Sequence, residues 1–149
     1  MIMKKVSILV STIDSGGAEK QAVLLAIQLS KHTDVNLIVL YGGHTEYKGN
    51  VDLLTKSSVK VHRLNGSMLL KTIRIRELLK ESHTDGLLNY LTMPDLLGSF
   101  LGKRLKISVY NGIRNSRLPR SKMLIEKWAH NHWATATIYN CYSGADYFE

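Results

Sequence analysis

Two adjacent glycines, Gly16 and Gly17, stand where a short apolar run gives way to an aliphatic segment. The β-branched run Val6–Val10 predicts a buried strand, and residues 22–29 predict a mostly buried helix. Glycine lets another group approach the backbone closely, and the first turn of a helix presents free N–H groups that favour negative charge. We therefore expect Ser15, Gly16 and Gly17 to form a loop that binds phosphate. The equal alternative is a plain turn, because this stretch has neither Gly-x-Gly-x-x-Gly nor Gly-Lys-Ser/Thr.

Polar side chains also stand at the ends of two later apolar runs, residues 85–91 and 106–110. Side chains at these ends could hydrogen-bond the hydroxyls of a ligand, and an arginine could pair with a phosphate through its planar fork. The alternative is that the strand ends meet water and the charges form a solvated face. The candidates for binding a ligand at these ends are Asn89, Thr92, Arg114, Asn115 and Arg117.

Apolar runs and helical patterns alternate along the whole chain. The predicted strands are residues 6–10, 35–41, 59–64, 85–91, 106–110 and 136–142. The predicted helices are residues 22–29, 69–80, 94–105, with Pro94 in the first turn, and 124–133, with a short helix near 52–56. This alternation predicts the α/β class, with a Rossmann-like parallel sheet of about six or seven strands and helices on both faces. Ligands of such sheets bind beyond the carboxyl ends of the strands, where all the candidate residues would lie.

The length and composition are those of an ordinary globular domain. The chain has 149 residues, of which 44% are hydrophobic, so it can bury a sizeable core as one domain. Cys141 is the only cysteine, which excludes an internal disulfide and favours a cytoplasmic location. The sequence has no stretch of about 20 apolar residues, so we expect no helix that spans a membrane.

The formal net charge is +8, which favours anionic partners. Basic residues crowd one region of the chain that holds a single acid, Glu126. These residues are Lys103, Arg104, Lys106, Arg114, Arg117, Arg120, Lys122 and Lys127. A solvated surface explains such a cluster as well as a function does. The functional alternatives are a phosphorylated ligand and the anionic inner face of a membrane, which attracts basic groups by about 1 kcal/mol per charge.

Neither a metal site nor a catalytic set can be assembled from the sequence. His130 and His132 are two residues apart on a predicted helix, so their side chains point in different directions. The sequence yields no Ser-His-Asp set, and Cys141 is expected to be buried and inert. We therefore predict no metal ligand and no cofactor.

The stretch Ser15-Gly16-Gly17-Ala18-Glu19 and the later stretch Asn-Gly-Ile-Arg-Asn-Ser, residues 111–116, follow the first and fifth predicted strands. In order and spacing, these motifs and the strands before them resemble the N-terminal domain of family 4 retaining glycosyltransferases, which have two facing Rossmann-like domains, the GT-B architecture. The resemblance covers essentially the whole chain. It implies that residues 1–149 are one acceptor-side domain, and that a C-terminal domain, expected to be absent here, binds most of the nucleotide sugar.

The resemblance assigns Gly16 and Gly17 to a loop beside the donor diphosphate and the acceptor, where preorganised N–H donors would stabilise the leaving diphosphate. Many relatives carry a histidine two residues before the proline that follows the fourth strand, and Thr92 occupies that position here, ahead of Pro94. A threonine can hydrogen-bond a hydroxyl but cannot act as the same general base, so no catalytic residue is assigned. We expect the chain alone to be inactive, with the nucleotide sugar a co-substrate of the complete hexosyltransferase.

The leading expectation is the acceptor-binding domain of a sugar-nucleotide-dependent glycosyltransferase that makes cell-surface polysaccharide or lipopolysaccharide. Its acceptor would be a sugar or a lipid-linked sugar, and it would lie in the cytoplasm, peripheral on the inner membrane face. The first alternative is a non-catalytic Rossmann-like module that binds a nucleotide or another phosphorylated ligand. A nucleic-acid binder is disfavoured, because stacking aromatics and helix-turn-helix or zinc patterns are missing.

Overall fold

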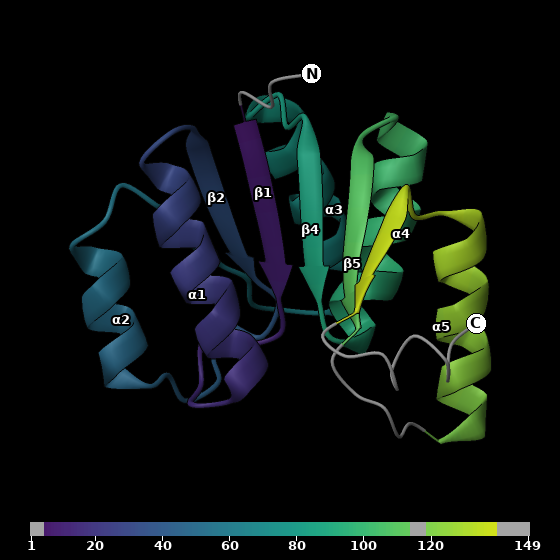
Figure 1. Cartoon of the computed structure of the whole chain (residues 1–149), viewed down its shortest axis with the longest axis horizontal. Coiled ribbons are helices and arrows are strands. Elements are labelled where there is room, and N and C mark those ends of the chain that lie inside the picture. The colour runs from purple at the N-terminus through teal and green to yellow at the C-terminus, as the bar shows by residue number, and fades with distance from the viewer. Residues whose placement is uncertain (1–4, 114–118, 140–149) are drawn as a thin grey trace.

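The computed structural model describes residues 5–113 and 119–139, which form a parallel sheet with helices on both faces (Figure 1). The strands are β1 Lys5–Val10, β2 Asp34–Val39, β3 Lys60–Arg63, β4 Gly86–Tyr90, β5 Ser108–Ile113 and β6 Ala136–Tyr139. The helices are α1 Gly17–Ser30, α2 Lys48–Thr55, α3 Met68–Glu81, α4 Thr92–Leu105 and α5 Arg120–His132. The predicted fold class is confirmed, with six strands in the described part of the chain.

The sheet has the order β3-β2-β1-β4-β5-β6, and every neighbouring pair is parallel. All the strands therefore end at one edge of the sheet, which lies at the bottom of Figure 1. The chain runs outward from β1 through β2 to β3, then returns to β4 and runs outward in the other direction. Sheets of this kind bind ligands beyond the point where the strand order reverses, which here is between β1 and β4.

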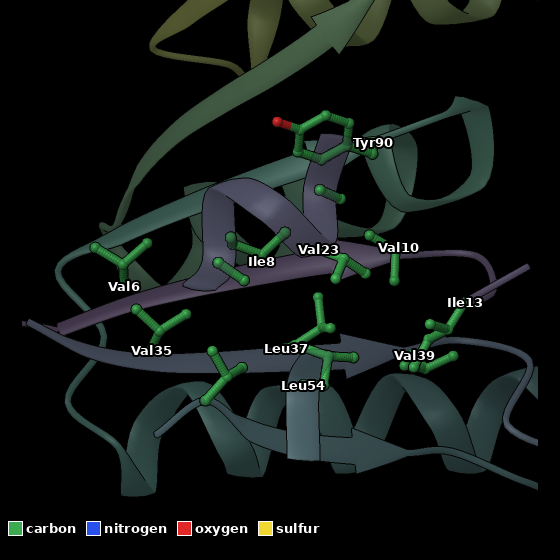
Figure 2. Close-up of a cluster of buried hydrophobic side chains, with 13 residues drawn as sticks. Val6, Ile8, Val10, Ile13, Val23, Val35, Leu37, Val39, Leu54 and Tyr90 are labelled. Atoms are coloured by element: carbon green, nitrogen blue, oxygen red, sulfur yellow. The ribbon is translucent and has the colours of Figure 1, made fainter. Parts of the chain in front are cut away.

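One cluster of buried side chains joins the sheet to α1 and α2. β1 contributes Val6, Ile8 and Val10 to this cluster, and they pack with Val23 of α1 and Leu54 of α2 (Figure 2). Because side chains alternate along a strand, these three residues share one face of the sheet. The β-branched, apolar composition of β1 fits a strand that is covered on both faces.

A second cluster covers the opposite face. It joins Leu9 of β1, Ile38 of β2 and Leu87 of β4 to Ile75 of α3 and Leu101 of α4. The helices that follow β1 and β4 thus lie on opposite faces of the sheet, as they must at a reversal of strand order. α5 continues the layer of α4 and packs beside it, near the β6 edge (Figure 1).

Three helices begin four or five residues earlier than the apolar pattern predicts, and α4 begins at Thr92, two residues before Pro94. α1 begins at Gly17 and not at residue 22, α2 at Lys48 and not near residue 52, and α5 at Arg120 and not at residue 124. The first turns of α1, α2 and α5 are rich in small, polar or exposed residues, and hydrophobic periodicity does not detect such turns.

The fifth strand was predicted at residues 106–110, and this range is wrong by two or three residues at each end. Lys106 instead closes α4 in the left-handed conformation, with φ 58°, and its N–H bonds the carbonyls of Gly102 and Lys103. The predicted end of β6 at residue 142 lies outside the described residues. Within the described ranges, we find no helix with both the length and the apolar character needed to cross a bilayer.

Candidate functional site

The predicted phosphate loop lies at the carboxyl edge of the sheet, where β1 leads into α1. Ser15, Gly16 and Gly17 are all exposed. Gly16 is the residue that precedes the helix, with φ −60° and ψ 153°, and it makes no side-chain cap. A Cβ atom built on Gly17 would have no neighbour within 4 Å, so the surrounding side chains leave Gly17 open. The first N–H groups of α1, which have no intrahelical acceptor, therefore stand at the surface.

The Glu19 carboxylate folds back over Gly16. A Cβ atom on Gly16 would stand 2.8 Å from Cδ of Glu19. Thr12 Oγ1 donates a hydrogen bond of 3.5 Å to Glu19 Oε1, which holds the carboxylate in this place. The helix dipole also favours an anion in the first turn. The Glu19 carboxylate therefore lies beside Gly16 in the first turn of α1, which the glycine pattern does not reveal.

The segment before the glycines is held by the loop after β2 and by α2. Asn50 Nδ2 donates to the carbonyl of Asp14 at 2.9 Å, and the N–H of Tyr47 donates to the carbonyl of Ile13 at 3.0 Å. His44 Nδ1 lies 3.8 Å from Asp14 Oδ2. The residues that follow β1 and β2 therefore form one continuous surface, as the carboxyl-end rule predicts.

β4 ends in a strained residue. Leu91 has φ 75° and ψ 165°, a region that essentially only glycine adopts without strain. Thr92 begins α4 immediately after it, and its side chain hydrogen-bonds the carboxyl group of Glu126 on α5. Because β4 pairs with β1, Thr92 lies at the same edge as the glycine loop, on the other side of the reversal point.

Asn89 lies deeper than the sequence suggests, because its side chain is fully buried. Its Nδ2 donates to Asn111 Oδ1 at 2.7 Å, and Asn111 Nδ2 donates to Ser99 Oγ at 2.7 Å. Asn89 is thus part of a polar chain that joins β4, β5 and α4, and it has no surface on which an acceptor could lie. The remaining acceptor candidates are Arg114, Asn115 and Arg117, which follow β5 and lie outside the described residues.

A buried polar cluster lies directly behind Thr92, and sequence reasoning missed it. Asp95 of α4 and Glu126 and His130 of α5 are 0%, 3% and 8% exposed. One ligand-type atom from each of the three side chains lies within 4.8 Å of the others. The signal available in the sequence was the spacing of Glu126 and His130, which are four residues apart and share one face of a helix.

Burial controls the protonation of this cluster. Burial, and then the charge of Glu126 beside it, raises the pKa of Asp95 well above its ordinary value. Burial also raises the pKa of Glu126, although hydrogen bonds from Asp95 and Thr92 oppose the rise. Burial lowers the pKa of His130 to about 4. At neutral pH His130 is therefore neutral, and its 3.7 Å contact with Asp95 is not an ion pair.

Comparison with known proteins identifies one similar sequence, and no protein-family model matches the chain. The chain is 32% identical over 95 residues to the Campylobacter jejuni enzyme named GalNAc-alpha-(1->4)-GalNAc-alpha-(1->3)-diNAcBac-PP-undecaprenol alpha-1,4-N-acetyl-D-galactosaminyltransferase. The matched region is 60% of this chain and 26% of that enzyme. The chain is thus similar to part of a glycosyltransferase and spans well under two thirds of its length.

Solved structures share the fold at low sequence identity. HepE from Anabaena, in complex with UDP-glucose, has a TM-score of 0.78 at 14% identity, over 97% of this chain and 39% of HepE. MurG from Acinetobacter baumannii has a TM-score of 0.63 at 15% identity, over 91% of this chain and 41% of MurG. UDP-N-acetylglucosamine 2-epimerase from Rickettsia bellii has a TM-score of 0.64 at 17% identity, over 99% of this chain and 41% of the epimerase. These likenesses support the fold, a Rossmann-like half of the GT-B kind.

Proposed function

We propose that the chain is the acceptor-side domain of a sugar-nucleotide-dependent glycosyltransferase of family 4. The observation that carries this proposal is the open glycine loop at the reversal point between β1 and β4, in a chain that is 32% identical over 95 residues to a glycosyltransferase. The nucleotide sugar would be a co-substrate held mainly by a second domain. Transfer itself would then require no cofactor in this domain.

In this proposal, Gly17 and the residues around it present N–H groups to the diphosphate of the donor or to the acceptor. Thr92 faces the same ligand from the other side of the reversal point. Arg114, Asn115 and Arg117 lie outside the described residues and stay predicted ligands of the same site. Asn89 supports the site from below, through Asn111, because it is buried.

The acceptor that we propose is a lipid-linked sugar of the cell-surface polysaccharide type. Support comes from the similar Campylobacter enzyme, whose name specifies an acceptor on PP-undecaprenol. Such an acceptor would bring the domain to the inner face of the membrane. α5 offers a matching surface, because Leu124 and Trp128 are 63% and 48% exposed and the exposed Arg120 and Lys122 lie on the same helix. Apolar and basic side chains together favour binding to anionic lipid.

Binding to the glycine loop can be tested with two matched variants, Gly17→Ala and Gly43→Ala. A methyl group on Gly17 would meet nothing within 4 Å, and one on Gly43 would stand at an ordinary 3.5 Å from Asn65 Oδ1, so both variants should fold. The probes are UDP, UDP-N-acetylgalactosamine and a short-chain N-acetylgalactosaminyl diphosphate lipid, each titrated into the ¹⁵N-labelled chain. We expect shifts at residues 15–19 and 92 with the diphosphate lipid, a marked loss of binding in G17A, and unchanged binding in G43A.

Three other outcomes would overturn the proposal. Binding of UDP alone, with no response to the diphosphate lipid, would favour the non-catalytic nucleotide-binding module. No shift at the glycine loop with any probe, in a chain that is folded by circular dichroism, would mean that Gly16 and Gly17 only form a turn. Equal binding by the wild type and G17A would place the ligand elsewhere.

The membrane surface is tested separately, by co-sedimentation of the chain with phosphatidylglycerol and phosphatidylcholine vesicles. We expect binding to phosphatidylglycerol alone, with a blue shift of tryptophan fluorescence, and a loss of binding in Leu124→Gln. Leu124→Gln changes an exposed side chain, so its fold is expected to be unchanged. If the wild type and Leu124→Gln bind the vesicles to the same extent, α5 is not the membrane-binding surface.

A further inference from the structure

The cluster of Asp95, Glu126 and His130 has a composition that the transferase function leaves unexplained. All three side chains are buried, and they come from two neighbouring helices, α4 and α5. Nothing in the proposed sugar transfer uses a histidine and two carboxyl groups at this depth. Burying such groups is unfavourable unless they are paired, hydrogen-bonded or bound to a metal, so the cluster needs a physical reason.

Asp95 is the most deeply buried of the three residues. It is 0% exposed, and as a carboxylate neither of its oxygens meets a hydrogen-bond donor in the described part of the chain. Glu126 Oε2 is likewise buried and has no hydrogen-bond partner among the described residues. Apart from the Thr92 hydroxyl, which bonds Glu126, these two neighbouring carboxyl groups meet no donor among the described residues, so they need a positive charge between them, which is either a shared proton or a cation.

His130 is held in the orientation that a metal ligand requires. Its Nδ1 lies 2.8 Å from Thr137 Oγ1 on β6, a hydrogen bond that fixes the ring. Its Nε2 is directed at Asp95, 3.7 Å from Oδ2. Histidines that bind metals commonly use the other ring nitrogen for such an orienting hydrogen bond. Glu126 is oriented in a similar way by the side chain of Thr92.

We propose that Asp95, Glu126 and His130 bind one divalent transition-metal ion of the Zn²⁺ class. Zinc accepts histidine nitrogen and carboxylate oxygen ligands at about 2.0–2.2 Å, whereas Mg²⁺ and Ca²⁺ prefer oxygen alone. Ligand atoms of a tetrahedral site therefore lie roughly 3.4 Å apart, as expected for bonds of that length. The three atoms already lie within 4.8 Å of one another, so small side-chain rotations would bring them into range.

The ion would connect the first turn of α4 to α5 and, through His130 and Thr137, to β6. It would lie behind Thr92 and would fix the start of α4 at the edge of the sheet. Its role would be structural, because the ligands are buried and turned away from the surface. The site is independent of the sugar-transfer proposal, so either can fail without the other.

The test uses the untagged 149-residue chain, stripped with EDTA and titrated separately with Co²⁺, Zn²⁺ and Mg²⁺. We expect visible Co²⁺ absorption that saturates at one ion per chain, displacement of Co²⁺ by Zn²⁺, a higher melting temperature with Zn²⁺, and no effect of Mg²⁺. His130→Gln should lose the absorption. The matched control is His132→Gln, since His132 is an exposed histidine on the same helix and should keep it.

Asp95→Asn is a second test variant, in case His130→Gln does not fold. Asparagine has the size of a protonated aspartic acid, so this variant should keep the fold while losing the Co²⁺ absorption. The proposal is overturned if the wild type shows no Co²⁺ absorption, which would leave a shared proton as the only positive charge in the cluster. It is also overturned if D95N and H130Q bind Co²⁺ as the wild type does.

Discussion

Asn89 of β4 donates a 2.7 Å hydrogen bond through Nδ2 to Asn111 Oδ1 on β5, side chain to side chain within the sheet. Both side chains are fully buried, and Asn111 Nδ2 in turn donates a hydrogen bond to Ser99 Oγ. Asn111→Ala would leave the amide of Asn89 and the hydroxyl of Ser99 without these partners. We expect a loss of about 1–3 kcal/mol in the free energy of unfolding, measured with urea. Asn131→Ala, on the exposed face of α5, should change it by less than about 0.5 kcal/mol.

Gly98 of α4 leaves no room for a side chain, because the amide of Asn89 lies against it. A Cβ atom on Gly98 would stand 2.6 Å from Asn89 Nδ2, and the hydrogen bond to Asn111 prevents the amide from moving away. Gly98→Ala should therefore destabilise the protein by about 1–3 kcal/mol, although alanine is the better helix former. Gly17→Ala, which adds the same methyl group in open space, should not lower the melting temperature; equal melting temperatures for the two variants would contradict this packing.

Because the backbone at Leu91 is strained, we expect glycine to give a more stable variant than alanine at this position, the reverse of the usual order. Leu91→Ala removes packing and keeps the unfavourable φ of 75°, whereas Leu91→Gly removes the same packing and relieves the strain. We expect L91G to be more stable than L91A by about 1–3 kcal/mol in urea unfolding. If L91A were the more stable of the two, the backbone at this position would not be strained.

His62 makes stability depend on pH. Burial, and then the charges of Arg74 and Lys60, lowers the pKa of His62 below its ordinary value of 6.5. The unfolded chain therefore binds a proton at a higher pH than the folded chain does, and stability falls as the pH drops below 6.5. The ring proton shift of His62 in NMR should titrate below pH 6.5. His62→Gln should flatten the decline in stability between pH 6.5 and 5, and His32→Gln, at an exposed histidine, should leave it unchanged.

The fold could be predicted from the sequence because its signals are local. Short β-branched runs, aliphatic helices and polar links alternate in the order that a parallel sheet requires, and no long-range information is needed to see them. The glycine loop and Thr92 were placed at one edge by the carboxyl-end rule alone, and the structure places them there. Helix starts and the range of β5 were less predictable, since these depend on polar residues and on the conformation of Lys106.

The interior of the candidate site could not be predicted in the same way. Asn89 lies at the end of an apolar strand and would be expected to face water, but it is buried, with its Nδ2 bonded to Asn111, which in turn donates to Ser99. Leu91 adopts a conformation that its residue type argues against. Asp95 and Glu126 would be placed on a solvated face by their charge, and only the packing of α5 beside α4 shows that they are buried together.

The Glu19 carboxylate has a consequence for ligand choice. Its carboxylate already lies at the N-terminus of α1. A diphosphate that binds there would have to displace this carboxylate, so its net binding free energy would be reduced by the interaction that Glu19 loses. A sugar hydroxyl is uncharged and could instead donate a hydrogen bond to the Glu19 carboxylate. Glu19 is therefore part of the surface that any ligand of the glycine loop must meet.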